Sequence, residues 1–139
     1  MFTAVVTTSP RFRLDPLLGE LRRDPLIRRI VLLAESAPEA CPPGCRVLAG
    51  DGPFAGRTWN ALLADAATPY LLLCPGTAGL SLAPAATGLL LNAVRTAGVG
   101  IAYGDYAELN GTALREHPVI DWQIGSLRDE LPYHRRTRA

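Results

Sequence analysis

The apolar positions of this chain fall into short runs of two kinds. Continuous apolar or β-branched runs predict strands over residues 2–8, 27–33, 46–49, 70–74 and 99–109. Apolar residues at helical spacing predict three helices: one that begins at Asp15, one that runs from Arg57 to a break at residues 68–69, and one over residues 83–97. The alternation of the two kinds is typical of an α/β fold.

Local signals refine these elements. Asp15 followed by Pro16 predicts a helix start with Asp15 as its N-cap, and Leu17, Leu18 and Leu21 then form the inward side. The pair Asn110-Gly111 is a strong hairpin signal, so residues 112–116 are expected to pair back antiparallel to the fifth strand.

The segment over residues 57–75 is the centre of the pattern. Residues 70–74 contain no polar alternation, which favours a strand covered on both faces in a parallel sheet. Ligands of open α/β sheets bind beyond the carboxyl ends of the strands. This edge is expected at Pro75-Gly76-Thr77. In the helix that follows, Leu89, Leu90, Ala93 and Val94 are the predicted buried side, with Gly98 as its C-cap.

The order of elements predicts a mostly parallel sheet with helices on both faces and a C-terminal β-hairpin, a three-layer α/β/α arrangement. The 139 residues suit one domain, which we expect over residues 1–133. Residues 134–139 are predicted to be a basic, flexible tail. His117 precedes Pro118, which predicts a turn at that point.

Composition narrows the classes of function. The net charge of +1 does not indicate a nucleic-acid-binding surface. No apolar run approaches the length of a membrane span, and no signal peptide is recognisable at the first residues, so we expect a cytoplasmic protein. Every basic residue is Arg, an excess that coding bias explains together with the frequent Ala, Gly and Pro.

The cysteines leave several alternatives open. Cys41 and Cys45 are one residue further apart than a redox or zinc-knuckle pair, and no second pair follows. They are interpreted either as ordinary loop thiols or as a disulfide or metal pair. Cys74 ends an apolar strand and is interpreted as a small core residue.

Several segments together resemble the amino-terminal half of a family 2 glycosyltransferase with the GT-A fold, which is Rossmann-like. Residues 2–9 look like its first strand and small-residue loop, residues 29–36 look like its second strand, and residues 56–73 look like its helix-then-strand segment. Residues 103–106 also suit the family, and residues 117–130 are similar to a segment of one bacterial branch of it. The likeness spans nearly the whole chain but contains no single decisive motif.

The resemblance implies binding of a nucleotide-sugar, and the chain also departs from the family. A family member carries an Asp-x-Asp after the fourth strand, whose carboxylates hold a divalent metal against the diphosphate of the donor. This chain has Cys74-Pro75-Gly76-Thr77 there, so we expect neither Mn²⁺ nor Mg²⁺ as a cofactor. The second half of the family's catalytic domain, with the acceptor site, is mostly missing.

The candidate site residues follow from the resemblance and from their places in the predicted fold. Ser9, Glu35, Arg57 and Asn60 are the candidates for nucleotide-sugar binding, and Asp105 is the candidate catalytic carboxylate. Each has a plainer alternative: a solvated or structural carboxylate for Asp105, a surface cation for Arg57, and a contact with a loop backbone for Asn60.

The residues leave two functions open. In the first, the chain is a glycosyltransferase-like domain that binds a nucleotide-sugar and transfers the sugar. In the second, it is a catalytically inactive module of the same fold that acts as a scaffold through self-association. A sheet that lacks the family's second half would expose apolar area, which predicts a homo-oligomer.

Overall fold

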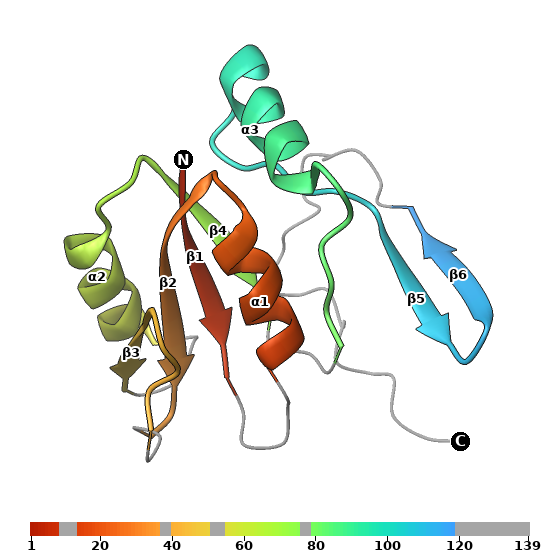
Figure 1. The fold of residues 1–139 in the computed structure, drawn as a ribbon. Helices are drawn as coiled ribbons and strands as arrows, with labels where there is room; N and C mark the ends of the chain where they lie inside the picture. Colours follow the sequence, from red (N-terminus) through yellow and green to blue (C-terminus); the bar gives the residue numbers. More distant parts are fainter. Residues whose placement is uncertain (9–13, 37–39, 51–54, 76–78, 119–139) are drawn as a thin grey trace, which may run out of the picture. The chain divides into compact units, whose positions relative to one another are not determined.

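The computed structural model describes residues 1–8, 14–36, 40–50, 55–75 and 79–118. The chain forms two compact units, Met1–Gly100 and Ile101–Ala139. The elements in chain order are β1 (Phe2–Thr7), α1 (Asp15–Arg23), β2 (Ile27–Ala34), β3 (Cys45–Ala49), α2 (Gly56–Asp65), β4 (Tyr70–Cys74), α3 (Ala86–Ala97), β5 (Tyr106–Asn110) and β6 (Ala113–His117) (Figure 1). The predicted tail, residues 134–139, lies outside the described residues.

The first unit is built on a parallel sheet. Its four strands are in the order β3-β2-β1-β4, and each neighbouring pair is parallel. Strand β1 lies between β2 and β4. Its Val5 pairs in register with Val31 of β2 on one side and with Leu73 of β4 on the other. The α/β class and the mostly parallel sheet are therefore confirmed.

Alternate residues of the strands supply two apolar clusters, as the pleat of a sheet requires. One cluster includes Ala4 and Val6 of β1 and receives residues of both α1 and α3, among them Leu18 and Leu91. The other cluster includes Val5 of β1 and receives residues of α2 (Leu62 and Trp59). The predicted inward side of α1, which is Leu17, Leu18 and Leu21, is buried as expected.

The helix ends differ in detail from the predictions. Leu14 is the N-cap of α1, so Asp15 lies inside the helix and Pro16 follows it. This shift still places the Asp15 carboxylate in the first turn, where the helix dipole favours a negative charge. Helix α3 begins at Ala86 because Ala85 adopts a left-handed backbone conformation with φ of 62°.

The predicted buried side of α3 was wrong in two positions. Thr87 and Leu91 are its buried residues, and Leu90 and Val94 pack partly against the core. Leu89 and Ala93 are exposed. The apolar stripe is therefore narrower than the run of aliphatic residues suggests.

The second unit contains a separate β-hairpin. The fifth strand was predicted over residues 99–109, but β5 covers only Tyr106–Asn110 and pairs with β6 alone. Gly98, Gly100 and Gly104 interrupt the apolar residues before it, and glycine weakens a strand. The hairpin itself is confirmed. Its two-residue loop is Gly111-Thr112, and Gly111 has a φ of 63°, a conformation that glycine adopts without strain.

Two further predictions need correction. His117 is the last residue of β6 rather than a turn residue, and its ring stacks on Tyr106, its cross-strand partner, with 4.5 Å between the ring centroids. Strand β4 is not covered on both faces, since Leu73 is 55% exposed. Within the described residues, β1 is the sole strand that pairs with β4.

Candidate functional site

The strand order defines where a ligand of this sheet would bind. From β1 the chain moves outward to β2 and β3, and it then returns to place β4 on the opposite side of β1. In open α/β sheets, ligands bind at such a reversal of strand order, at the carboxyl ends of the strands. The site expected from this topology therefore lies at the carboxyl ends of β1 and β4, where Thr7 and Cys74 are the last strand residues.

Backbone contacts hold the loops together at this carboxyl edge. Thr8 donates from its amide to the carbonyl of Leu33 over 2.8 Å, and its hydroxyl donates to the same oxygen over 3.2 Å. The amide of Gly50 donates to the carbonyl of Ala34 over 3.1 Å. The segments that follow β1 and β3 are thus both attached to the end of β2.

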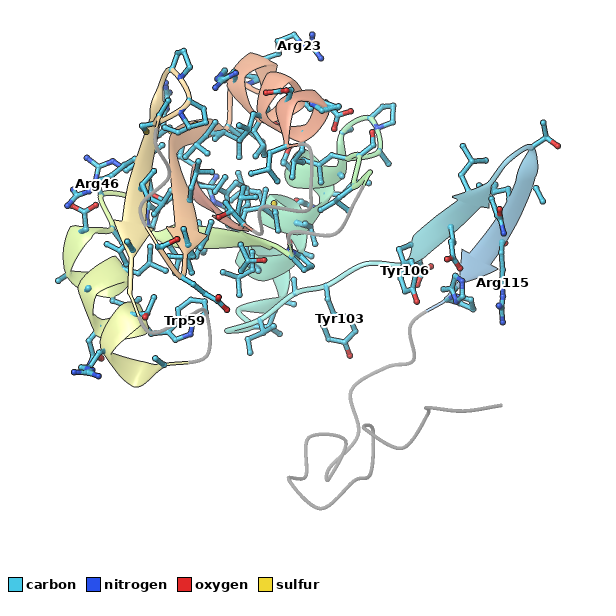
Figure 2. The ribbon with its side chains drawn as sticks, turned by 90° about the horizontal axis from the view of Figure 1, so that it is seen from below. Arg23, Arg46, Trp59, Tyr103, Tyr106 and Arg115 are labelled. Atoms are coloured by element: carbon cyan, nitrogen blue, oxygen red, sulfur yellow. The ribbon has the colours of Figure 1, made fainter. Side chains whose placement is uncertain are left out.

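The first turn of α2 joins the same edge. A Cβ added to Gly50 would lie 3.4 Å from Oγ1 of Thr58, so the loop after β3 passes close to this helix. Thr58 is buried, whereas its neighbour Arg57 is exposed. Figure 2 views the sheet from its carboxyl edge and shows Trp59 beside the start of α2.

Three of the predicted binding residues come to this edge. Glu35 directly follows β2 and is exposed, and Arg57 and Asn60 are exposed in the first two turns of α2. No side chain among the described residues caps the amino end of α2, which carries the positive end of the helix dipole. The edge therefore brings together a cation, a helix amino end, an amide and a carboxylate.

The other two candidates stand differently. Ser9 lies outside the described residues. Asp105 is exposed and directly precedes β5, in the unit Ile101–Ala139. Its candidacy depended on a place at the end of a strand of the main sheet, and the hairpin in the second unit removes that reason. We therefore do not assign Asp105 to the carboxyl edge of the first unit.

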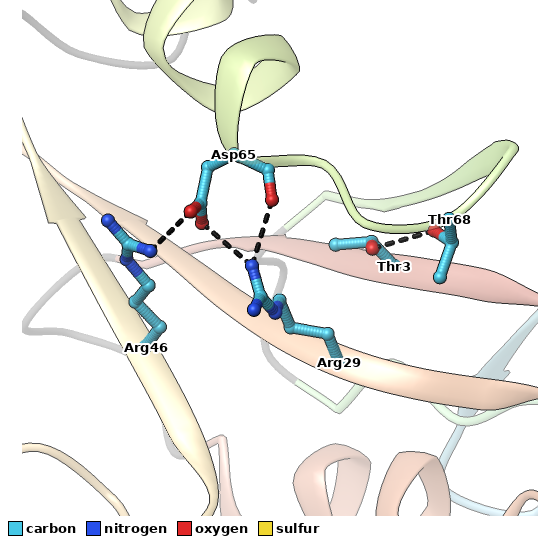
Figure 3. A network of polar contacts seen from close by, with 5 residues as sticks. All are labelled: Thr3, Arg29, Arg46, Asp65 and Thr68. Carbon is cyan, nitrogen blue, oxygen red and sulfur yellow. Dashed lines mark hydrogen bonds and ion pairs between the residues drawn. The ribbon is translucent and has the colours of Figure 1, made fainter.

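A polar network at the opposite end of α2 positions the helix over the sheet (Figure 3). Nη1 of Arg29, on β2, donates to the backbone carbonyl of Asp65 over 2.8 Å and to its carboxylate over 3.1 Å. Arg46, on β3, forms a second ion pair with the same carboxylate. Arg29 therefore satisfies a terminal carbonyl of α2 and places a positive charge at the negative end of its dipole.

The network continues into the turn before β4. The hydroxyl of Thr68 donates to the carbonyl of Tyr70 over 3.0 Å. Its oxygen is 2.7 Å from the hydroxyl oxygen of Thr3, a residue that is fully buried on β1. These contacts attach the chain between α2 and β4 to the sheet, so the position of α2 is set from its carboxyl end.

The resemblance to glycosyltransferases implies a metal at the end of β4, and the residues there do not fit one. Burial raises the pKa of the Cys74 thiol to about 11, so the sulfur is protonated at neutral pH and is a poor ligand. Pro75 offers no side-chain donor. Among the described residues, no group of three or more His, Cys, Asp or Glu side chains is arranged to hold a metal ion.

Contacts that the sequence patterns did not reveal also shape the site. Thr8 and Gly50 fix the loops, and Asp65 fixes the helix. Asp65 is a polar residue at the end of a helix, just before a Thr-Pro break, and this was the sequence signal available for it. Its partners Arg29 and Arg46 lie 36 and 19 residues away in sequence, so local patterns do not reveal them. Of the part of the chain that the structure describes, no helix combines the length and the apolar character needed to cross a membrane.

Comparison with known proteins adds no relative. No protein-family model, curated protein or solved structure matches this chain.

Proposed function

We propose that the unit Met1–Gly100 is a glycosyltransferase-like domain of the three-layer GT-A type that binds a nucleotide-sugar at the carboxyl edge of its sheet. The observation that carries this proposal is the strand order β3-β2-β1-β4 with a reversal between β1 and β4. Glu35, Arg57 and Asn60 belong to loops and a helix at that same edge.

Each of these residues has a distinct role in the proposed complex. The Arg57 guanidinium and the amino end of α2 attract the diphosphate, since both carry positive charge and N–H donors. Glu35 accepts hydrogen bonds from the base or ribose hydroxyl groups of the nucleotide. Asn60 supplies one amide donor and one acceptor to the sugar or to a phosphate oxygen.

Catalysis requires more than this edge supplies. Departure of a nucleoside diphosphate develops negative charge, which a metal or several cations must stabilise. The end of β4 does not fit a metal, and Arg57 is the single cation that the proposal places at the diphosphate. The proposed domain therefore binds the donor without turning it over. Release of nucleoside diphosphate by the purified chain would contradict this part of the proposal.

A thermal-shift titration with UDP, GDP and their sugars, each with and without Mn²⁺, tests the binding. We expect the melting temperature to rise with one nucleotide class and to rise equally in EDTA. Arg57→Ala should abolish the shift, while Arg95→Ala is the matched control, because Arg95 is an exposed residue in the last turn of α3. A shift that requires Mn²⁺ would show that another carboxylate set holds a metal.

A second candidate function is supported by the edge of the sheet. Strand β4 contains no charged residue, and Leu73 is 55% exposed. An edge strand without charged residues presents unpaired backbone groups to a second strand. In this alternative the fold is an inactive scaffold that self-associates into a homo-oligomer. Light scattering of the wild-type chain and of Leu73→Glu distinguishes the two: a monomer mass in both would leave nucleotide binding as the function.

A further inference from the structure

The segment from Cys41 to Cys45 forms a tight turn at the start of β3. The amide of Cys45 donates to the carbonyl of Pro42 over 3.1 Å, which closes the turn. Pro43 and Gly44 are the central residues, and Gly44 has a φ of 72°. Proline at the first central position and a left-handed glycine at the second are the residues that a type II turn requires. The turn therefore brings the chain on either side of it together.

The two cysteines lie next to each other as a result. Sγ of Cys41 is 3.1 Å from the carbonyl oxygen of Cys45, although three residues separate them in sequence. Cys41 is exposed and Cys45 is partly buried. Cys41 directly precedes the turn and Cys45 is its last residue, so the closed turn brings the two cysteines near each other.

A single arginine contacts both the turn and one of the sulfurs. Nη2 of Arg22, in the last turn of α1, donates to the carbonyl of Pro43 over 2.6 Å and lies 3.6 Å from Sγ of Cys45. The Arg22 guanidinium therefore places a charged hydrogen-bond donor beside the Cys45 sulfur, where negative charge gathers when that sulfur attacks an oxidant. The Cys41 thiol instead donates to the carbonyl oxygens of Pro42 and Cys45.

We propose that Cys41 and Cys45 form an oxidisable dithiol, in which Cys45 reacts with a hydroperoxide and Cys41 then closes an intramolecular disulfide. The Cys45 thiolate attacks the distal oxygen of the hydroperoxide and the O–O bond breaks; the departing alkoxide or hydroxide takes up the proton that the Cys45 thiol had released and leaves as an alcohol or water. The sulfur of Cys45 is thereby oxidised to a sulfenic acid. The Cys41 thiol gives up its proton as its sulfur attacks the sulfur of Cys45, the S–O bond breaks, and the departing hydroxide takes that proton and leaves as water. The net reaction consumes one hydroperoxide per disulfide.

The third cysteine provides an internal control. Cys74 is 2% exposed and burial raises the pKa of its thiol, so it has neither access nor thiolate character. Cys74 should therefore stay reduced in the folded chain under conditions that oxidise Cys41 and Cys45.

The test is hydrogen peroxide oxidation of the folded full chain, followed by mass spectrometry of peptides and by non-reducing electrophoresis. We expect a loss of two hydrogen masses from the peptide that joins Cys41 and Cys45, with the chain remaining monomeric on the denaturing gel. In Cys41→Ser, dimedone should trap a sulfenic acid at Cys45. In Cys45→Ser, Cys41 should react no faster than free cysteine.

Variants of α1 test the role of the arginine. Arg22→Gln should slow oxidation of Cys45 by about tenfold, because the thiolate loses its charged hydrogen-bond donor, and Arg22→Lys should restore part of the rate. Arg23→Gln is the matched control, because Arg23 is exposed in the same turn. An intermolecular disulfide, equal rates at Cys41 and Cys45, or an unchanged rate in Arg22→Gln would each overturn the proposal. Circular dichroism of each variant verifies that the fold is retained.

Discussion

Replacement of Asp65 by alanine tests how α2, and with it the proposed site, is held over the sheet. The substitution removes the carboxylate that accepts from both Arg29 and Arg46. It leaves the backbone carbonyl of residue 65 in place, so Arg29 keeps its 2.8 Å hydrogen bond to that oxygen. The change therefore isolates the contribution of the side chain.

The expected loss follows from the exposure of the partners. The side chains of Arg29 and Asp65 are 37% and 23% exposed, whereas Arg46 is 54% exposed. A hydrogen bond to a charged group contributes about 1.5–3 kcal/mol when buried, and an exposed ion pair about 0–1 kcal/mol. Solvent screening reduces the first value here, so Asp65→Ala should cost about 1–2 kcal/mol.

Urea unfolding monitored by circular dichroism measures this free energy. A double-mutant cycle with Arg29→Met should give a coupling energy of about 0.5–1.5 kcal/mol, because the two side chains contact each other directly. Arg46→Met alone should cost less than about 1 kcal/mol. If Asp65→Ala costs less than about 0.3 kcal/mol, which is within the range of ordinary surface substitutions, the network does not hold α2.

Three further predictions concern the rest of the fold. Leu18→Ala should destabilise the first unit by about 2–4 kcal/mol in urea unfolding, since Leu18 is 1% exposed in the core beneath α1; a cost below about 1 kcal/mol would contradict that packing. Hydrogen bonds from Ser81 and from the amide of Leu82 lower the pKa of Glu20. Its stabilisation is therefore present above the unfolded pKa and is lost as pH falls through the folded pKa. The stability difference between wild type and Glu20→Gln should shrink as pH falls below 4.5, the ordinary pKa of the carboxyl; a constant difference would count against the contact. Gly111→Ala should weaken the hairpin by about 1 kcal/mol because of its positive φ, which amide exchange of β5 and β6 would report; unchanged exchange would refute it.

The elements that could be predicted from the sequence are those with strong local signals. Strand β4 was predicted with its observed bounds because proline residues flank an apolar run on both sides. The hairpin was predicted from Asn110-Gly111, although its loop is Gly111-Thr112, one residue further along, and Asn110 pairs with Ala113. The buried side chains of α1 could be predicted from helical spacing alone, since Leu17, Leu18 and Leu21 lie on one face of the helix.

The features that could not be predicted depend on contacts between distant residues. The apolar run before β5 resembles a strand of the main sheet, but it has no partner strand there among the described residues, and local propensity does not encode pairing. The exposure of Leu73 depends on what covers β4, which no pattern within β4 reveals. The attachment of Asp65 to Arg29 and Arg46 likewise appears only once β2, β3 and α2 are folded together.

Two-dimensional NMR of the isotopically labelled chain, titrated with UDP and GDP in EDTA, tests metal-independent nucleotide binding at the carboxyl edge. We expect one nucleotide to shift the amide signals of Thr8, Glu35, Gly50 and the first turn of α2, which together form that edge of the sheet. Saturable shifts confined to these residues would locate the site as proposed. An unchanged spectrum with both nucleotides, or shifts centred on the hairpin of β5 and β6, would contradict it.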